Sequence, residues 1–322
     1  MHLIHLLNLT IDMKLIDSSV DILEQEPGVI GLYKHIEKVG RVTYKSEDKI
    51  TDTSYINFIN MLDKRGHWAP FDLGTVYLKL PIYKIGLAWK LRSPWTKIKV
   101  RFSGIYITTT YRIIHRLGLR KEMEKYWCEP GKYHSLRITS HWICSRGISH
   151  ELVRHKVLCP MMESTRYCLY SGSKFGGELT FIIPQWVYSE RDKFAETLDS
   201  TTGNSRSYLK SLSGQELWDS MCCISKLVAS RDMHFREVES EYLYETEKEK
   251  LKPEDARGVL STDIKTELYL TGYLDDYIKT PSKNSKEKLG FFYLRTANDA
   301  HPDVRILAKK LEQDFKDHGF TS

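Results

Sequence analysis

The residues best suited to chemistry are concentrated in one stretch, LVRHKVLCPMMESTRYCLYS at residues 152–171. A basic run, RHK at residues 154–156, is followed by the donor-rich triplet STR at residues 164–166. Guanidinium, hydroxyl and backbone N–H groups can together hold a phosphate or the edge of a base. Apolar residues, among them Met161 and Met162, lie between the two sets of donors. The stretch therefore predicts a site that holds a polar, anionic ligand against an apolar wall.

Histidine and cysteine also gather near this stretch, as His141, Cys144, His150, His155 and Cys159. A tetrahedral zinc site usually takes its ligands from closely spaced pairs, which this set lacks. The neighbouring arginines would also oppose the binding of a cation. We therefore predict no metal site.

The elements that position these residues follow from the apolar spacing. A helix is expected to begin near His141, with Ile148 and Leu152 on its buried side. Pro160 lacks a backbone donor and disfavours helix at the residue before it, so the helix should end shortly after Lys156. The basic run then lies at a helix C-terminus, where the helix dipole favours cations. A solvated helix end is the alternative interpretation of the same pattern.

Three segments of the N-terminal part have recognisable patterns. Residues 18–25 are expected to form a short helix that Pro27 and Gly28 end, and residues 52–63 a second helix. Alternation of apolar and polar residues over residues 75–82 predicts a strand with one buried face.

The remaining segments are surface or core. Residues 84–101 are basic and aromatic without a clear period, which indicates an inserted surface segment, and residues 106–111 could form a strand or begin a helix. A C-terminal helix that ends near Gly319 is predicted by apolar residues at helical spacing, namely Val304, Leu307, Leu311 and Phe315. Three tryptophans are interpreted as packing residues, namely Trp142, Trp186 and Trp218.

Composition limits the class of protein. The 322 residues are 41% hydrophobic and 28% charged, which is typical of a globular chain and not of a disordered one. The formal net charge of +6 suits anionic small molecules at least as well as nucleic acid. The six cysteines show no paired CxxC spacing, so free thiols in a reducing cytoplasm are expected. No apolar run reaches the length that a membrane span needs.

The stretch resembles the signature of flavin-dependent thymidylate synthases, in which Arg-His-Arg is followed after seven residues by serine. Here Arg154-His155-Lys156 is followed after seven residues by Ser164. The flanking segments ISHELVRHK and ESTRYCLYSGSKFGGELTFIIP extend the resemblance. Four further segments occur in the family's order along the chain, namely GHWAPF (residues 66–71), PEDARGVL (residues 253–260), TELYLTGYL (residues 266–274) and GFFYLRTANDAHP (residues 290–302).

The resemblance implies a single α/β (α+β) domain over residues 1–322, with a mainly antiparallel sheet flanked by long helices. The chain is most similar to the longer form of the family from phages and some bacteria, with an insertion at about residues 84–137 and a loop insertion at about residues 278–289. The family assembles as a homotetramer with shared active sites. The resemblance also implies a cytoplasmic location, in a bacterium or a phage-infected host.

The implied reaction converts dUMP to dTMP, with methylenetetrahydrofolate as the carbon donor and NADPH-reduced FAD as the source of hydride. No enzyme nucleophile is required, so Ser164 is expected to bind the nucleotide. The absence of an activating His–Asp pair near Ser164 agrees with this role. All four ligands carry anionic groups, which suits a modestly basic chain.

The resemblance also assigns roles to individual residues. The residues expected at the reacting centre are Arg295, beside the uracil N3, and His67, close to the flavin ring. The expected cofactor-binding residues are Arg154, His155, Lys156, Ala69, Met162, Tyr273 and Gly290. The expected nucleotide-binding residues are Glu151, Arg154, Glu163, Ser164, Thr165, Arg166, Arg257 and Arg295. A satisfied core or capping histidine is the alternative for His67, and a solvated arginine is the alternative for Arg257.

Five of these positions depart from the family pattern. Lys156 stands where arginine is usual, which keeps the charge but loses a bidentate fork. Glu151 stands where many members have glutamine, which changes a donor into an acceptor. Met162 replaces a polar residue, Tyr273 falls where some members have asparagine, and Gly290 stands where others have histidine or asparagine.

Two other classes of protein remain open from the sequence. A nucleic-acid-binding protein could use the basic aromatic residues 84–101, although no stable nucleic-acid partner is expected. A related flavin–folate enzyme could modify a different uracil or leave a different product. The co-occurrence of ESTRY with Arg257 and Arg295 favours a free mononucleotide as the substrate.

Overall fold

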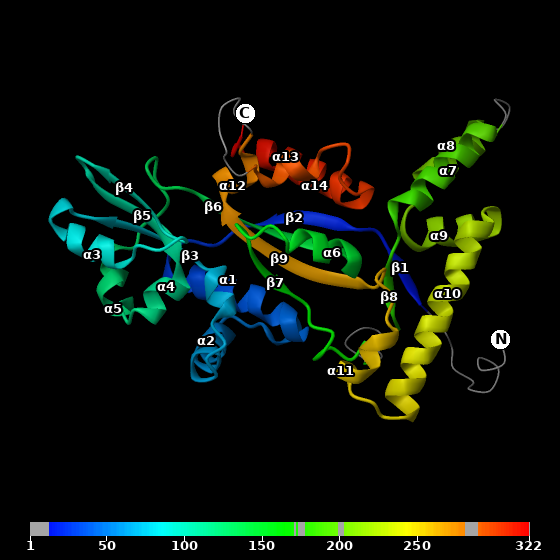
Figure 1. Ribbon diagram of the computed structural model, residues 1–322, viewed down its shortest axis with the longest axis horizontal. Coiled ribbons are helices and arrows are strands. Elements are labelled where there is room, and N and C mark those ends of the chain that lie inside the picture. Colours follow the sequence, from blue (N-terminus) through cyan, green and yellow to red (C-terminus); the bar gives the residue numbers. More distant parts are fainter. Residues whose placement is uncertain (1–12, 171, 173–177, 199–202, 281–288, 322) are drawn as a thin grey trace.

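The computed structural model describes residues 13–170, 172, 178–198, 203–280 and 289–321, and three β-sheets organise this part of the chain (Figure 1). The central sheet has the strand order β2-β6-β9-β7, with every neighbouring pair antiparallel. Its strands are β2 (Ser19–Leu23), β6 (Arg137–Ser145), β9 (Lys265–Tyr273) and β7 (Cys159–Met162). The predicted class, a mainly antiparallel sheet flanked by helices, is confirmed.

One face of the central sheet is covered by C-terminal helices. The helices that share a core with this sheet are α6 (Arg146–Leu152), α12 (Leu274–Ile278), α13 (Phe291–Arg295) and α14 (Pro302–Asp317). The four residues predicted for the buried side of α14 are all buried, namely Val304, Leu307, Leu311 and Phe315. Gly319 follows the helix with a φ of 69°, a conformation that glycine adopts without strain. The prediction for this helix is confirmed.

A second antiparallel sheet, β3-β5-β4, lies beside the central one, and residues 84–137 supply two of its strands, β4 and β5. Its strands are β3 (Thr75–Leu80), β5 (Gly104–Thr110) and β4 (Lys97–Arg101). The helices around it are α1 (Gly28–Arg41), α2 (Ser54–Lys64), α3 (Ile85–Lys90), α4 (Tyr111–Arg116) and α5 (Arg120–Met123). The predicted helix at residues 52–63 and strand at residues 75–82 are confirmed as α2 and β3.

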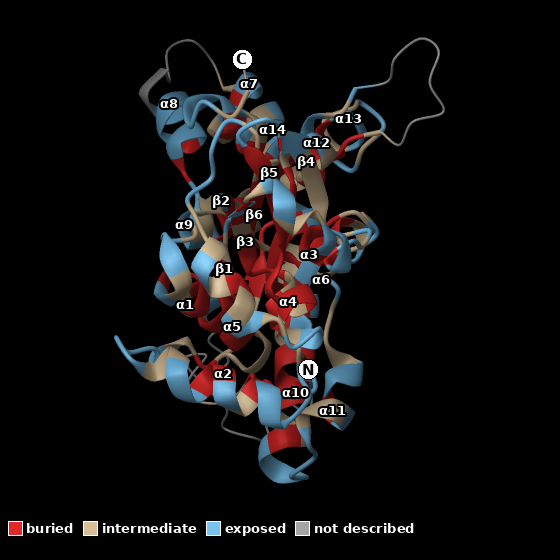
Figure 2. Ribbon diagram, turned by 90° about the vertical axis from the view of Figure 1, so that its left-hand side faces the viewer, coloured by how far each residue is buried: buried red, intermediate tan, exposed pale blue. Residues whose placement is uncertain are grey.

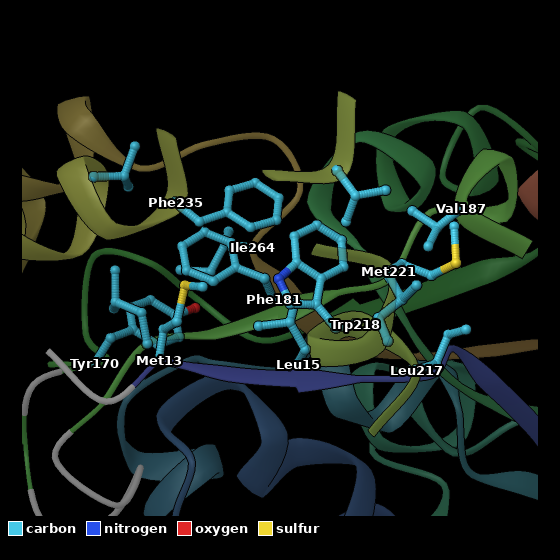
Figure 3. Close-up of a cluster of buried hydrophobic side chains, with 14 of the residues drawn as sticks. Met13, Leu15, Tyr170, Phe181, Val187, Leu217, Trp218, Met221, Phe235 and Ile264 are labelled. Carbon is cyan, nitrogen blue, oxygen red and sulfur yellow. The ribbon is translucent and has the colours of Figure 1, made fainter. Parts of the chain in front are cut away.

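A third unit is formed by a short parallel pair of strands and a group of helices. The strands are β1 (Lys14–Ile16) and β8 (Thr180–Ile182). The helices are α7 (Gln185–Thr197), α8 (Gly203–Ser211), α9 (Gly214–Ile224), α10 (Lys226–Leu243) and α11 (Pro253–Ala256). Figure 3 shows the core of this unit, where the ring of Phe235 stacks on Phe181 with centroids 4.2 Å apart and on Trp218 with centroids 5.5 Å apart.

The expected helix at residues 18–25 is wrong, because this segment forms the edge strand β2. Val20 is fully buried while Asp21 beside it is exposed, which is the alternation of a strand. Pro27 does not end a helix but precedes α1, in an extended conformation with φ −62° and ψ 155°. Proline is favoured at such a helix start because it has no N–H to leave unpaired.

The expected helix from His141 is also wrong over its first half, because residues up to Ser145 form β6 and the helix α6 begins at Arg146. The helix ends at Leu152, before the basic run. Residues 84–101, for which no period was found, form α3 and β4.

Burial follows the three sheets. Figure 2 shows the buried residues along the central strands and the exposed residues on the outer surfaces of the helices. Trp142 and Trp218 are fully buried and Trp186 packs against the core of the third unit, which confirms these tryptophans as packing residues.

All six cysteines have free thiols, as predicted. None of the helices in the described part of the chain is long and apolar enough to cross a membrane.

Candidate active site

The clearest meeting of predicted site residues is the contact of Arg295, at the end of α13, with Glu151 and His155. The guanidinium donates from Nη1 to Glu151 Oε2 at 3.0 Å and from Nη2 to the Glu151 carbonyl at 3.1 Å. It also donates from Nε to His155 Nε2 at 2.6 Å. These bonds use three of the five N–H groups that a guanidinium offers. Counting only partners in the described residues, two N–H groups of Arg295 remain for a ligand.

Burial and the neighbouring arginine keep the imidazole of His155 neutral. Its ring packs against Phe291 with centroids 4.9 Å apart. Burial first, and then the charge of Arg295, lower the pKa of His155 to about 4. Because Nε2 accepts from Arg295, the single proton of the neutral ring is on Nδ1. His155 therefore orients the guanidinium as an acceptor and does not compete with it as a second cation.

Local sequence explains this geometry. The side chain of Ser145 caps α6 by accepting from the N–H of Ile148 at 3.3 Å. Ile148 and Leu152 are buried against the central sheet, which fixes the face of the helix that carries Glu151. The chain turns after Leu152, so Arg154 and Lys156 are exposed while His155 between them is half-buried. The three residues of the basic run thus differ in their surroundings.

The second group of predicted residues begins at Glu163, which is buried at the end of β7. Its carboxylate accepts from the hydroxyl of Tyr170 at 2.6 Å and from Lys265 Nζ at 3.1 Å. Lys265 also contacts Glu267, two residues along β9, and Lys45 contacts the same carboxylate. Burial opposes ionisation of Glu267, but the hydrogen bond from His141 and the charges of Lys265 and Lys45 outweigh burial and lower its pKa.

This buried charge network was missed by the sequence analysis. Lys265 and Glu267 are two residues apart on a strand, so their side chains face the same side of the sheet. Burial opposes the charged form of Lys265, yet the charges of Glu163 and Glu267 raise its pKa. A lysine and a glutamate spaced by two in the otherwise apolar segment KTELYLTGY were the available signal.

The turn after Glu163 was predicted correctly. The N–H of Ser164 donates to the Thr43 carbonyl at 3.2 Å, and the hydroxyl of Ser164 accepts from the N–H of Arg166 at 3.3 Å. Thr165 is buried and Arg166 is exposed. A guanidinium N–H of Arg166 donates to Glu254 at 3.3 Å.

The contact with Glu254 places the turn beside α11, and the predicted nucleotide residue Arg257 follows that helix. Arg257 is the first residue of the 3₁₀ helix η10 (Arg257–Val259) and is exposed. Arg166 and Arg257 are thus two exposed cations on adjoining elements. Such a pair suits a phosphate group.

Four further predicted residues differ in how far they are buried. His67 and Ala69 are exposed near the 3₁₀ helix η4 (Ala69–Asp72), after α2. Met162, the last residue of β7, is half-buried and packs against the core under α6 and α14. Tyr273 is buried, with its hydroxyl 2.9 Å from the Trp95 carbonyl and 2.8 Å from the Thr108 carbonyl.

Gly290 precedes α13 and is held by a close backbone approach. Its N–H donates to the Lys279 carbonyl at 2.8 Å. A Cβ atom at Gly290 would lie 2.5 Å from the backbone nitrogen of Lys279 and 2.9 Å from the Tyr277 carbonyl. The backbone of Lys279 therefore occupies the space that a side chain at this position would need.

The two groups of residues lie at opposite ends of β7. His155 precedes the strand and Ser164 follows it. The strand has four residues, which separates its ends by roughly 10 Å at the usual rise per residue. Figure 1 shows α13 above the central sheet and α11 below it. Within the described residues, Arg295 contacts His155 before the strand, and Arg166 contacts Glu254 of α11 after it.

The chain was compared with protein families and known proteins. A family model described as thymidylate synthase complementing protein matches residues 134–318, which is more than half of the chain. Comparison with curated protein sequences found no match. The matched residues include both the signature and the segments that contain Arg257 and Arg295.

Solved structures with some similarity were also found. The UMP/dUMP methylase PolB from Streptomyces cacaoi bound with 5-Br dUMP has 15% sequence identity and a TM-score of 0.37, with 94% of this chain and 92% of that chain covered. Thymidylate Synthase X from Helicobacter pylori with FAD and dUMP has 17% identity and a TM-score of 0.32, with 63% of this chain and 76% of that chain covered. The family match confirms the resemblance found in the signature. The chain belongs to the thymidylate synthase complementing protein family.

Proposed function

We propose that the chain is a flavin-dependent thymidylate synthase, which makes dTMP from dUMP with methylenetetrahydrofolate as the carbon donor and NADPH-reduced FAD as the source of hydride. The observation that carries the proposal is the hydrogen bond between Arg295 and His155, residues 140 positions apart in the sequence. This bond joins the signature to the second motif that the reaction needs. Membership of the family supports the same reaction.

The residues around the signature fit an anionic dinucleotide. Arg154 and Lys156 are exposed cations, and His67 is an exposed imidazole. The indole N–H of Trp68, next to His67, is buried and has no acceptor in the described residues, so it can donate to a ligand. When bound, FAD supplies the hydride that completes the methyl group. The hydroxyl of Tyr273 is already engaged with the carbonyls of Trp95 and Thr108, so it offers no free donor to the cofactor.

The chain's own residues would activate the pyrimidine electrostatically. The two remaining N–H groups of Arg295 would donate to a uracil ring and stabilise negative charge that develops at N3. Negative charge at N3 raises the electron density at the ring carbon that must attack. Glu151 and His155 hold the guanidinium in one orientation, so it does not need to reorganise during the reaction.

The phosphate of the nucleotide would be held elsewhere on the chain. Arg166 and Arg257 supply guanidinium donors, and the turn at Ser164 supplies a hydroxyl. Because these residues and Arg295 lie at opposite ends of β7, we propose that one chain supplies the phosphate site and another supplies Arg295. A homotetramer with shared active sites accommodates this separation.

The test is the visible spectrum of the purified full chain with added FAD, followed by NADPH oxidation with and without dUMP. Bound flavin that is reduced faster with dUMP supports the proposal. Arg295→Ala should lose at least about 100-fold of the dUMP-dependent rate, the scale of a lost electrostatic donor. Lys309→Ala, at an exposed position on α14, is the matched control and should leave the rate unchanged.

The other outcomes separate the alternatives. A methylated product from UMP but not from dUMP would indicate a related enzyme with a different substrate. An absence of flavin binding, together with salt-sensitive binding of nucleic acid, would contradict the proposal and favour a nucleic-acid-binding protein.

A further inference from the structure

A cavity of about 330 Å³ lies at the start of β6, and none of the residues predicted for the active site lines it. The strand β2 ends at Leu23, opposite Thr139, so the first residues of β6 have no partner from β2. The chain turns away there and leaves an opening between the central sheet, β3 and the start of α1. The volume is that of a pocket for a small organic molecule.

The positively charged residue in the lining of this cavity is Arg137, which is buried with 8% of its surface exposed. Its guanidinium donates to the Asp72 carbonyl at 2.9 Å and to the Thr75 hydroxyl at 3.3 Å, and it lies 3.8 Å from the sulfur of Cys159. All three acceptors are uncharged. The carboxylate of Asp72 instead pairs with Arg112 at 2.5 Å.

No carboxylate in the described part of the chain forms an ion pair with Arg137. A buried charge without a counter-charge is costly, and burial favours charges that are paired. Histidine does not add to the charge here, because burial first and Arg137 second lower the pKa of nearby His35 to about 3. Arg137 is therefore a buried cation without an ion pair in the described residues, and it shares the lining of the cavity with carboxylates.

A second donor lines the same cavity. The indole N–H of Trp127 is buried and has no acceptor in the described residues. Buried donors in folded proteins are nearly always paired, so an unpaired one next to a cavity indicates a missing acceptor. Both donors belong to residues that line the cavity, and a carboxylate offers two acceptor oxygens.

The walls and the opening define the rest of the ligand. Most of the lining is apolar, and aromatic rings are supplied by Tyr77, Trp127 and Phe320. Three exposed glutamates also line the cavity, namely Glu24, Glu26 and Glu129. Their charge would repel a dianion such as a nucleotide phosphate more strongly than a ligand with one negative charge.

We propose that this cavity binds a small aromatic monocarboxylate, with its carboxylate on Arg137 and its ring against the apolar and aromatic wall. No residue predicted for the active site lines the cavity, although Tyr273 pairs with Arg137 across β6 and β9. The inference does not depend on the proposed reaction. Cys159, which contacts Arg137, begins the strand β7 that leads to the Ser164 turn. Occupancy of the cavity would therefore act on a strand that joins the two groups of active-site residues.

The first test compares benzoate with benzamide, which has the same shape and no charge, by isothermal titration calorimetry on the full chain. Benzoate should bind at one site per chain, and benzamide should bind at least about tenfold more weakly, because the charge-assisted bond is lost. Equal affinities would overturn the proposal. An absence of benzoate binding at about 20 mM, which corresponds to affinity too weak for a built site, would also overturn it.

Variants locate the binding. Arg137→Lys keeps the charge but loses the bidentate fork, so it should weaken benzoate less than Arg137→Met, which should lose more than about tenfold. Because loss of a buried arginine could unfold the chain, Trp127→Phe is the second variant, and it should weaken benzoate while the circular dichroism stays native. Lys132→Met removes an exposed cation and is the control. The proposal would be overturned if Lys132→Met lowered the affinity for benzoate while Trp127→Phe and folded Arg137→Met left it unchanged.

Discussion

At the scale of single residues, Arg295 and His155 depend on each other. Arg295 lowers the pKa of His155, and the neutral His155 in turn accepts a hydrogen bond from Arg295. The motif predicted that both residues lie near the site, but it did not predict their contact. Side-chain contacts across 140 positions depend on how α6 and α13 pack, which sequence spacing does not encode.

The first prediction concerns the pKa of His155. Arg295→Met removes a nearby positive charge, so the pKa of His155 should rise from about 4 part of the way to the ordinary 6.5. The rise should be partial, because burial is the larger cause. The titration of the imidazole can be followed by NMR. An unchanged pKa would mean that the guanidinium does not contact the ring in solution.

The same shift has a consequence for stability against pH. The folded chain holds the pKa of His155 below that of an unfolded histidine, so the unfolded chain binds this proton more readily. The contribution of His155 to the free energy of unfolding is present above about pH 6.5 and is lost as the pH falls towards about 4. In Arg295→Met this loss should be smaller, as measured by urea denaturation over that range.

At the scale of secondary structure, strand β9 supplies Lys265 and Glu267 to the buried charge network, which also includes Glu163 just before the Ser164 turn. Lys265→Met would leave Glu163 and Glu267 with less counter-charge in a buried place. We expect the free energy of unfolding to fall by roughly 3–5 kcal/mol, the usual cost of breaking a buried pair from one side. Urea denaturation measures the change.

Two further variants test the cause of this loss. Lys49→Met, at an exposed lysine, is the control and should change stability little. Adding Glu163→Gln to Lys265→Met should recover part of the loss, because it removes one of the unpaired charges. A loss below about 1 kcal/mol for Lys265→Met would show that the network is solvated.

The third prediction concerns the close packing of α12 and α13. Gly290→Ala would place a methyl group 2.5 Å from the backbone nitrogen of Lys279. Relief of this clash should cost about 1–3 kcal/mol, as in other overpacked positions. Gly86→Ala is the matched control, because a Cβ there meets nothing within 4 Å and lies in α3. Equal thermal melting of the two variants would contradict the packing described for Gly290.

The sequence predicted some elements and not others for physical reasons. The helix α14 was predicted because its apolar residues keep a helical period to its end. The part of β6 from His141 was predicted as helix because Arg146, His150 and Arg154 are spaced by four just beyond it. The helix α1 was missed because Pro27 and Gly28 were interpreted as an end and not as a start.

At the scale of the whole molecule, the proposed nucleotide site is divided between the two ends of β7. The sequence does not show how the site residues are arranged, whereas Figure 1 shows α13, which contains Arg295, above the central sheet and α11, which Arg257 follows, below it. The position of a partner chain is not a property of local spacing. The division therefore makes the assembly part of the account.

A complementation experiment tests the shared site. Arg295→Ala and Arg257→Ala should each be inactive alone. If sites are shared, unfolding and refolding the two variants together at equal amounts should restore about a quarter of the wild-type activity, since a quarter of the sites then combine two intact halves. No recovery, or an active monomer by light scattering, would contradict the shared arrangement.

The most direct measurement of the central claim is the mass of the nucleotide product. The full chain would be incubated with FAD, NADPH, dUMP and methylenetetrahydrofolate labelled in the transferred carbon. The account predicts dTMP that carries the label in its methyl group, and no such product from Arg295→Ala. Unchanged dUMP, with flavin bound and NADPH oxidised in the same reaction, would contradict the claim that the chain is a thymidylate synthase.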